Sequence, residues 1–417
     1  MTVSAVLLLL ALSAPPSTLR VDLLHGGDSE REWFILDSVT EVPFPCGNPA
    51  KPFDETNLGQ YFARVSDLAT NRPLWTRGFS DLFWEWRTTK EAKSRSRALP
   101  VVVRIPAPSA PVQLEIAARG RDGVFRPVFT TTIDPRSLDV SRVRRRSDLV
   151  VRDVMVNGPP EGKVDVLFVP EGYRADQMEK FRADVSRLAE ALFSFAPYGE
   201  LRQRFNVRAI EVPSREAGCG EPRKGFFPDT AFSLSFNTFG SARYMASPDV
   251  TALHDAASNA PFDQLVVIVN TARYGGGGVF NAYNVTISDN PFDEYVLVHE
   301  FGHGFASLGD EYFDSEVAYD GFYPPGVEPW EPNITASGES PKWKDLVTPG
   351  VPLPTPADPA RFGDAVGAFE GAGYAAKGLF RAKIDCKMIG KGRVGFCPPC
   401  ERAIRRVIDL YSEEAPE

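Results

Sequence analysis

The segment Asn290–His303, with the sequence NPFDEYVLVHEFGH, is the most informative stretch of the 417-residue chain. Asn290 is a favourable N-cap residue, because its side-chain oxygen can accept hydrogen bonds from free backbone N–H groups at a helix start. Pro291 suits the first helical position, and Asp293 and Glu294 complement the positive end of the helix dipole. The segment therefore predicts a helix that begins at Asn290, whatever chemistry it carries.

Two histidines in this predicted helix have the spacing of metal ligands. His299 and His303 lie one turn apart on the same face, where both imidazoles can bind one Zn²⁺. Glu300 points one position round the helix, where it can take a proton from water beside the metal and pass it to a leaving amine. The chain has only four histidines, so half of them belong to this pair. The spacing predicts a zinc site with Glu300 as its general base.

A catalytic zinc site has three protein ligands and one open position. A third histidine six residues after His303 is excluded, because that position is Gly309. Glycine there suits the left-handed end of the helix, which would return the chain toward the metal. Asp310 follows directly and is the preferred third ligand, although it could instead cap the next element. Glu311 is the close competitor, and Glu370 in a later segment is the rival.

The sequence around this helix alternates between strand and helix patterns. Apolar runs predict strands, and apolar residues at three- and four-residue spacing predict an amphipathic helix. The pattern predicts a mixed α/β catalytic domain over residues 151–417. The expected strands are Val164–Pro170, Phe205–Val212, Leu265–Asn270 and Asn281–Ser288, and the expected helix is Met178–Leu192.

Tyr274–Gly278 reads YGGGG and interrupts this pattern. No Lys-Ser/Thr follows, so the segment is not a phosphate loop. Four glycines favour a turn, or a rim where another backbone comes close. Either Leu265–Asn270 or the strand after the glycines is expected to form the sheet edge that pairs with an extended substrate.

The amino-terminal third of the chain is rich in short strand patterns. Runs such as Leu99–Ile105 and Val112–Ala117 are bounded by Pro and Gly and predict a small all-β sandwich over residues 18–140. An aromatic cluster in this region is expected to pack between its sheets, and its members are Phe79, Phe83, Trp84 and Trp86. Residues 141–150, rich in arginine, are the predicted linker to the second domain.

Residues 1–17 have the pattern of a signal peptide. Val3–Ala14 is an apolar stretch of the length of a signal-peptide core, followed by two prolines and a serine. We therefore expect a secreted, periplasmic or cell-surface protein. No apolar run reaches the roughly 18–20 residues of a transmembrane segment. The net charge of −9 argues against nucleic acid as a partner.

Three of the five cysteines lie close together near the carboxyl end of the chain. Cys386, Cys397 and Cys400 have the spacing of a structural zinc knuckle, but no fourth ligand lies nearby in the sequence. A disulfide between Cys386 and one of the other two is favoured in an exported protein.

Several motifs in order resemble the M64 family of metallopeptidases, which is named after an immunoglobulin A peptidase. They are LRVDLLHGG, RGFSDLFWEWRTTKEA, VDVLFVPEGYRADQMEKFRAD, NTARYGGGGVFNAYN, VLVHEFGHGFASLGDEY, FEGAGY and CKM with FCPPC. The resemblance implies a secreted zinc endopeptidase, with a β-sandwich ahead of a zincin domain of metzincin-like type. It implies His299 and His303 as ligands and Glu300 as base, and it supports Asp310 in the DEY element. It does not carry over immunoglobulin A as a substrate.

Three other residues complete the expected site. Met388 falls where a metzincin-like domain has the methionine turn beneath its metal histidines, although it could be plain core filler. A tetrahedral oxyanion needs a second stabiliser, for which Tyr374 and Tyr312 are candidates, with buried structural roles as the alternative.

The expected substrate is a protein or peptide, and the oligomeric state is left open. Two other functions are compatible with the motifs. One is metal-dependent hydrolysis of a non-peptide amide, such as one in the cell wall. The other is surface binding with a structural metal, against which the free Glu300 argues.

Overall fold

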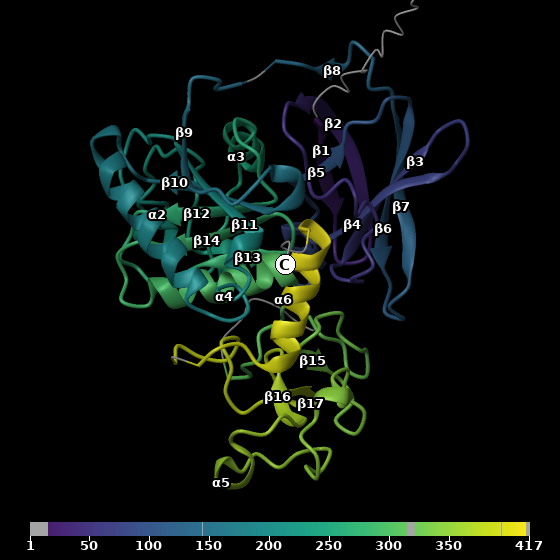
Figure 1. Ribbon diagram of the computed structural model, residues 1–417, viewed down its shortest axis with the longest axis vertical. Coiled ribbons are helices and arrows are strands. Elements are labelled where there is room, and N and C mark those ends of the chain that lie inside the picture. The colour runs from purple at the N-terminus through teal and green to yellow at the C-terminus, as the bar shows by residue number, and fades with distance from the viewer. Residues whose placement is uncertain (1–15, 144, 315–321, 393, 414–417) are drawn as a thin grey trace, which may run out of the picture.

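The computed structural model of the chain describes residues 16–143, 145–314, 322–392 and 394–413. Figure 1 shows three parts: an amino-terminal pair of sheets, a larger sheet flanked by helices, and a smaller carboxyl-terminal part below them. The predicted leader core, Val3–Ala14, lies outside the described residues. Among the described helices, none combines the length and the apolar character needed to cross a bilayer.

The amino-terminal part consists of two four-stranded sheets that share one core. Their strand orders are β5-β1-β2-β8 and β4-β3-β6-β7. Alternate residues of the strands, such as Val112, Leu114 and Ile116, are fully buried between the sheets, in the predicted sandwich arrangement. The strands are β1 (Thr18–Gly27), β2 (Glu32–Val42), β3 (Tyr61–Asp67), β4 (Pro73–Phe79), β5 (Arg97–Pro106), β6 (Val112–Arg119), β7 (Phe125–Ile133) and β8 (Val140–Ser141).

The predicted aromatic cluster divides between core and surface. Helix α1 (Leu82–Arg87) begins at Asp81, whose side chain accepts a hydrogen bond from the backbone N–H of Trp84. Phe79 of β4 packs in the core between the two sheets, as predicted, whereas Phe83 and Trp86 are fully buried in a separate small cluster. Trp84 is only partly buried: it packs against the core of the sandwich and also lines a cleft.

The larger part is built on a six-stranded sheet with the order β13-β14-β12-β10-β11-β9. The four central strands run parallel, and the two edge strands are antiparallel. Their bounds are β9 (Val150–Met155), β10 (Val164–Glu171), β11 (Phe205–Glu211), β12 (Gln264–Val269), β13 (Gly277–Val279) and β14 (Tyr283–Ile287). The predicted linker spans the stretch between β8 and β9.

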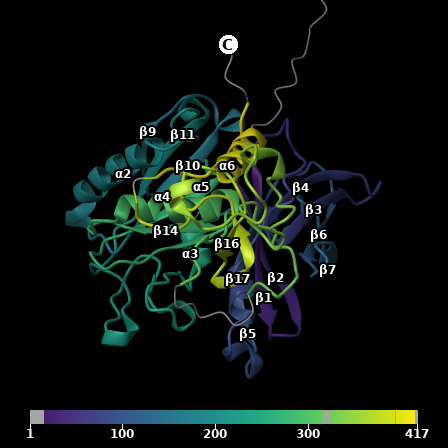
Figure 2. The ribbon, with the colours of Figure 1, turned by 90° about the horizontal axis from the view of Figure 1, so that it is seen from below.

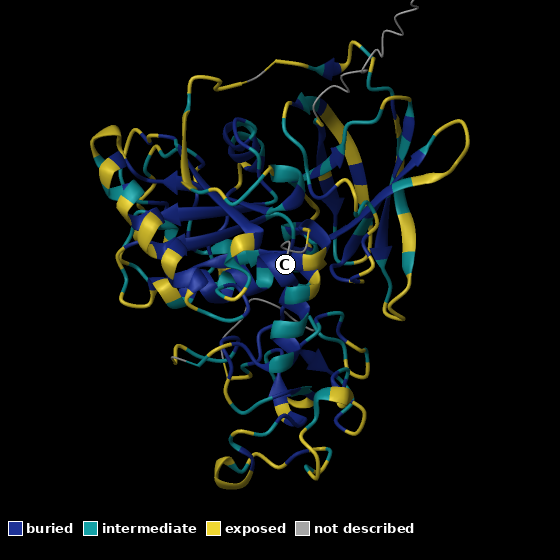
Figure 3. Ribbon diagram, viewed as in Figure 1, coloured by how far each residue is buried: buried dark blue, intermediate teal, exposed yellow. Residues whose placement is uncertain are grey.

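Helices cover both faces of this sheet. Val166 and Phe168 of β10 pack in the same core cluster as helices α2 (Met178–Phe193) and α4 (Asp293–Ala306). Leu167 and Val169 point to the other face, which α3 (Val250–Ala257) covers. Because both faces are buried, the strands are almost continuously apolar, which explains why the sequence predicted them. The outer side of α2 remains exposed (Figure 3).

The order of the strands corrects the expectation about which strand forms the edge of the sheet. Leu265–Asn270 corresponds to β12, and Asn281–Ser288 contains β14, and both lie inside the sheet. The edge beside β14 is β13, which is formed by the glycine stretch itself. Strand order depends on long-range pairing, so the apolar pattern of a segment could not distinguish a central strand from its neighbour at the edge.

The ends of α4 also differ from the prediction. The helix begins at Asp293 with Phe292 at its N-cap position, while Asn290 accepts a hydrogen bond from Phe292 N–H in the turn before it. At the other end, Ser307 adopts the left-handed conformation with φ of 51°. Gly309 has another role, because a Cβ there would lie 2.5 Å from Ile334 Cδ1. Close packing, and not a positive φ, requires glycine at that position.

The carboxyl-terminal part holds a three-stranded sheet with the order β15-β17-β16. Its elements are β15 (Ile334–Thr335), β16 (Phe369–Ala372), β17 (Ala375–Arg381) and the short helix α5 (Pro359–Phe362). Helix α6 (Pro398–Tyr411) then returns to the upper parts, where Arg77 of β4 stacks on Tyr411. Figures 1 and 2 agree in placing the amino-terminal sheets beside the six-stranded sheet. An ion pair of 2.7 Å between Arg20 and Asp255 joins the two.

Candidate metal centre and active site

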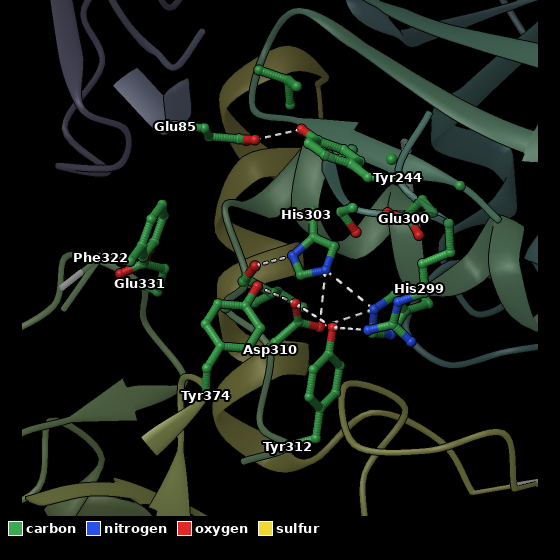
Figure 4. Close-up of a pocket in the computed structure, with 18 of the residues that line it drawn as sticks. Glu85, Tyr244, His299, Glu300, His303, Asp310, Tyr312, Phe322, Glu331 and Tyr374 are labelled. Carbon is green, nitrogen blue, oxygen red and sulfur yellow. Dashed lines mark hydrogen bonds and ion pairs between the residues drawn. The ribbon is translucent and has the colours of Figure 1, made fainter. Parts of the chain in front are cut away.

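A cleft of about 430 Å³ opens where these parts meet. Helix α4 contributes His299, Glu300 and His303 to its lining, and the loop after the helix contributes Asp310 (Figure 4). The cleft is also lined by the β13 glycines, by α1 of the amino-terminal part and by the turn that contains Tyr374. The predicted site residues therefore lie in the wall of one open cavity.

Three potential ligand atoms converge in this cleft. The Nε2 atoms of His299 and His303 lie 3.2 Å apart, and Asp310 Oδ1 lies 3.0 Å and 3.3 Å from them. Asp310 Oδ1 is buried and accepts no hydrogen bond. Two imidazole nitrogens and a carboxylate oxygen are a donor set that suits a divalent transition metal, so the residues present fit such an ion.

The opposite nitrogen of each imidazole faces a hydrogen-bond acceptor. His303 Nδ1 lies 2.5 Å from the carbonyl oxygen of Leu308, and His299 Nδ1 lies 3.2 Å from that of Lys387. A carbonyl can only accept, so each Nδ1 carries a hydrogen and each Nε2 directs its lone pair toward Asp310. The left-handed Ser307 turns the chain so that the Leu308 carbonyl reaches back to the helix.

Asp310 is held in place by two tyrosines. Its Oδ2 accepts hydrogen bonds from Tyr312 Oη at 2.9 Å and from Tyr374 Oη at 2.5 Å. Arg243 in turn donates to the Tyr312 oxygen at 3.1 Å. The sequence made both tyrosines candidates for oxyanion stabilisation, with structural roles as the alternative, and in this structure both hydroxyls donate to the carboxylate.

The charges of Asp310 and His303 shift each other's pKa values. Burial alone would raise the pKa of Asp310, but the two imidazoles hold it well below its ordinary value. Burial would lower the pKa of His303, but the neighbouring Asp310 carboxylate raises it to about 9. The raised pKa favours a proton on the His303 imidazole when no metal is bound.

Glu300 lies beside the imidazole pair against the glycine stretch. A Cβ at Gly276 would lie 2.7 Å from Glu300 Oε1, and one at Gly278 would lie 2.3 Å from the Glu300 carbonyl oxygen. The glycines thus mark a close approach of backbones, one of the two uses predicted for them. Burial raises the pKa of Glu300, although the nearby histidines partly oppose this.

The two competing third ligands lie elsewhere. Glu311 is fully buried and points to the cysteines near α6, with its Oε1 3.3 Å from Cys400 Sγ. Glu370 is exposed and accepts a hydrogen bond from Gly378 N–H in the three-stranded sheet. Of the three carboxylates considered from sequence, the structure brings only Asp310 to the imidazoles.

Two known family models match the chain over most of its length. The family model described as IgA Peptidase M64 matches residues 153–363 and 357–408, and the one described as Peptidase M64 N-terminus matches residues 13–130. The chain belongs to the M64 peptidase family. Membership makes this protein a metallopeptidase, a hydrolase that acts on protein substrates. The chain matches none of the curated proteins with which it was compared.

In this M64 peptidase, Met388 lies directly beneath the metal-site helix. It is fully buried, and its sulfur would lie 2.9 Å from a Cβ at Gly302 of α4. Its carbonyl oxygen accepts a hydrogen bond from Glu311 N–H at 2.9 Å. The segment around Met388 therefore supports both the helix and the loop that carries Asp310.

Within the described residues no disulfide joins Cys386 to Cys397 or Cys400, which corrects the expectation of a bond to Cys386. All five cysteines are free thiols. Cys386, Cys397 and Cys400 instead converge with the Glu311 carboxylate, a fourth potential ligand group that sequence spacing failed to find. Glu311 belongs to the DEY element far upstream, so only the folded chain brings it to the cysteines.

Several other residues that line the cleft escaped sequence reasoning. Tyr295 Oη lies 3.2 Å from His299 Nδ1, and Tyr244 Oη lies 2.5 Å from Glu85 Oε2 at the far side of the pocket (Figure 4). Tyr295 could have been found, since it lies one turn before His299 on the same helix. Glu85 and Tyr244 come from different parts of the molecule, and no local pattern connects them.

Proposed function

We propose that this M64 peptidase is a zinc-dependent endopeptidase in which His299, His303 and Asp310 hold the ion and Glu300 is the general base. The observation that carries the proposal is the convergence of two imidazole nitrogens and an orphaned carboxylate oxygen, 3.0 Å to 3.3 Å apart, in an open cleft. Three protein ligands leave the fourth position of tetrahedral Zn²⁺ free, as hydrolysis requires.

The bound ion would supply Lewis-acid polarisation of the scissile carbonyl and of the attacking water. Glu300 accepts the proton of that water on a carboxylate oxygen and later delivers it to the nitrogen of the leaving amine. Burial raises the pKa of this carboxyl, which makes Glu300 a stronger base than an exposed glutamate. Gly276 leaves room for this carboxylate, because a Cβ at that position would lie 2.7 Å from Glu300 Oε1.

The proposal includes a catalytic domain of zincin, metzincin-like type. Three features support it: a histidine-bearing helix beneath a mixed sheet, an antiparallel strand β13 at the edge of that sheet beside the cleft, and Met388 packed under the helix. We further propose that an extended substrate adds to the β13 edge, since an edge strand offers unpaired backbone groups. Export through the leader-like segment at residues 3–14 is also part of the proposal.

The base and ligand roles are tested together with two variants. Glu300→Gln keeps the shape of the side chain but cannot accept the proton, so we expect zinc content near wild type and turnover of casein reduced by at least about a hundredfold. Asp310→Ala removes an anionic ligand, so we expect zinc content measured by elemental analysis to fall. Retained turnover in Glu300→Gln contradicts the base role. Unchanged zinc in Asp310→Ala contradicts the ligand role.

The same assay separates the peptidase from an amide hydrolase with another substrate. Wild-type enzyme is incubated in parallel with casein, a peptide library and cell-wall fragments, with Glu300→Gln as the blank. We expect cleavage of casein or peptides, because the family acts on protein substrates. Turnover of the cell-wall fragments alone would contradict the peptidase proposal.

A further inference from the structure

A second group of potential ligands lies behind the first. Cys397 is the N-cap residue of α6, Cys400 lies in the first turn of that helix, and Cys386 precedes Met388. Together with Glu311 they place four ligand atoms within 4.8 Å of one another. The sulfur of Cys400 lies 3.4 Å from that of Cys397 and 3.9 Å from that of Cys386. All four side chains are buried.

Ordinary core packing does not account for this cluster. Glu311 Oε1 accepts a hydrogen bond from Asn333 Nδ2 at 2.9 Å, but the buried Oε2 has no hydrogen-bond partner. Within the described ranges, no Lys or Arg forms an ion pair with Glu311, although the guanidinium of Arg381 is near enough for its charge to interact with the carboxylate. An ionised carboxylate that is buried without a directly paired cation is unfavourable, so a cation bound beside it would stabilise the cluster.

A disulfide does not complete the cluster either. One disulfide would use two of the three cysteines and leave a thiol and the carboxylate buried together. A single cation uses all four groups. The Cys-x₂-Cys spacing of Cys397 and Cys400 is that of zinc ligands, and the amino-terminal end of a 14-residue helix favours thiolates. The backbone N–H of Cys397 also donates to Cys386 Sγ at 3.3 Å.

We propose that Glu311, Cys386, Cys397 and Cys400 bind a second, structural Zn²⁺, separate from the ion of the imidazole pair. Three thiolates favour Zn²⁺ over harder ions such as Mg²⁺ or Ca²⁺. Four protein ligands close the tetrahedron and leave no position for a substrate, so the ion is structural.

The location of this ion gives it a supporting role for the first site. Glu311 directly follows Asp310, and its N–H donates to the carbonyl oxygen of Met388. Lys387, between Cys386 and Met388, offers its carbonyl oxygen to His299 Nδ1. The structural ion joins these two segments to the start of α6. It thereby fixes Asp310, a proposed ligand of the imidazole centre, and the Lys387 carbonyl oxygen, which is the hydrogen-bond partner of His299.

The test counts zinc ions in protein purified without reductant. We expect two zinc ions per chain in wild type and one in the double variant His299→Ala/His303→Ala. The double variant Cys397→Ser/Cys400→Ser is expected to lose the structural ion, while Cys219→Ser, which alters a buried thiol outside the cluster, keeps both. After exchange of zinc for Co²⁺, wild type and the histidine variant should show thiolate-to-cobalt charge-transfer absorption.

The histidine variant tests this proposal separately from the proposed catalytic function. The zinc ion that this variant retains, and its thiolate-to-cobalt absorption, do not depend on which residues hydrolyse peptides. A histidine variant free of zinc, or one without thiolate absorption, overturns the second site.

Wild-type protein also provides a test that does not depend on folding of the cysteine variants. It is unfolded with chelator, alkylated without reductant and analysed by mass spectrometry. We expect all five cysteines to be alkylated. A disulfide-linked peptide containing Cys386, Cys397 or Cys400 overturns the proposal.

Discussion

At the scale of single residues, the protonation state of His303 is linked to the affinity of the site for a metal ion. Its Nδ1 is committed to the Leu308 carbonyl, so its Nε2 holds either a proton or a cation. The Asp310 carboxylate stabilises both, which is why it raises the pKa of this imidazole to about 9. The same geometry that would hold the proposed zinc ion therefore makes protons compete with it.

This competition predicts how zinc affinity depends on pH. Below about pH 9 the metal-free site holds a proton on His303, and zinc binds only after that proton leaves. We expect the apparent zinc affinity of the metal-free protein to fall by up to about tenfold for each pH unit below that value. Competition with a chromophoric chelator at several pH values measures it. Calorimetry in buffers of different ionisation enthalpy should show about one proton released, and release of none would contradict the argument.

At the scale of elements, the site depends on how closely β13 approaches α4. A Cβ at Gly278 would meet the Glu300 carbonyl oxygen at 2.3 Å and His303 Cβ at 2.9 Å. Neither contact can be relieved by rotating a flexible side chain. The strand can lie against α4 only because this position has no side chain.

Gly278→Ala should therefore push the edge strand away from the helix. Overpacking of this kind costs about 1–3 kcal/mol in unfolding free energy, and we expect a lower Tm together with a loss of turnover. Thermal unfolding and casein cleavage measure the two effects. The matched control is Gly395→Ala, since a Cβ at that exposed position meets nothing within 4 Å. If the two variants had the same Tm and the same turnover, the close approach of β13 to α4 would not be needed for stability or activity.

At the scale of the whole molecule, the amino-terminal part forms one wall of the cleft. Trp84 of α1 packs edge-on against Trp330 with ring centroids 5.9 Å apart, and Glu85 accepts a hydrogen bond from Tyr244. The sandwich thus contributes directly to the space where substrate would lie. Its aromatic cluster has two roles, with Phe83 and Trp86 in the core and Trp84 at the surface of the cleft.

The position of this wall predicts a role in recognition of longer substrates. Trp84→Ala removes a large apolar surface from the cleft but no metal ligand. We expect KM for protein substrates to rise several-fold, while zinc content and cleavage of a short peptide change little. Trp33→Ala is the control, because Trp33 is an exposed tryptophan of β2 outside the cleft. Equal KM values for the two variants would contradict a substrate-binding role for the amino-terminal part.

The sequence by itself determined the features that are local along the chain. The helical spacing of His299 and His303, the apolar strands and the amphipathic α2 depend on residues a few positions apart, so their periodicity predicted them. It could not predict that α4 begins at Asp293, that Ser307 and not Gly309 turns left-handed, or that β13 is the edge strand. These outcomes depend on packing between segments distant in sequence.

Only the tertiary structure decided which groups meet in space. The sequence left open whether Asp310, Glu311 or Glu370 is the third metal ligand. All three are carboxylates, and the chain between each of them and the histidines could fold so as to bring the two together. Folding directs Asp310 to the imidazoles and the adjacent Glu311 to the cysteines. Neighbours in an extended segment point to opposite sides, so two consecutive acidic residues can serve two separate sites.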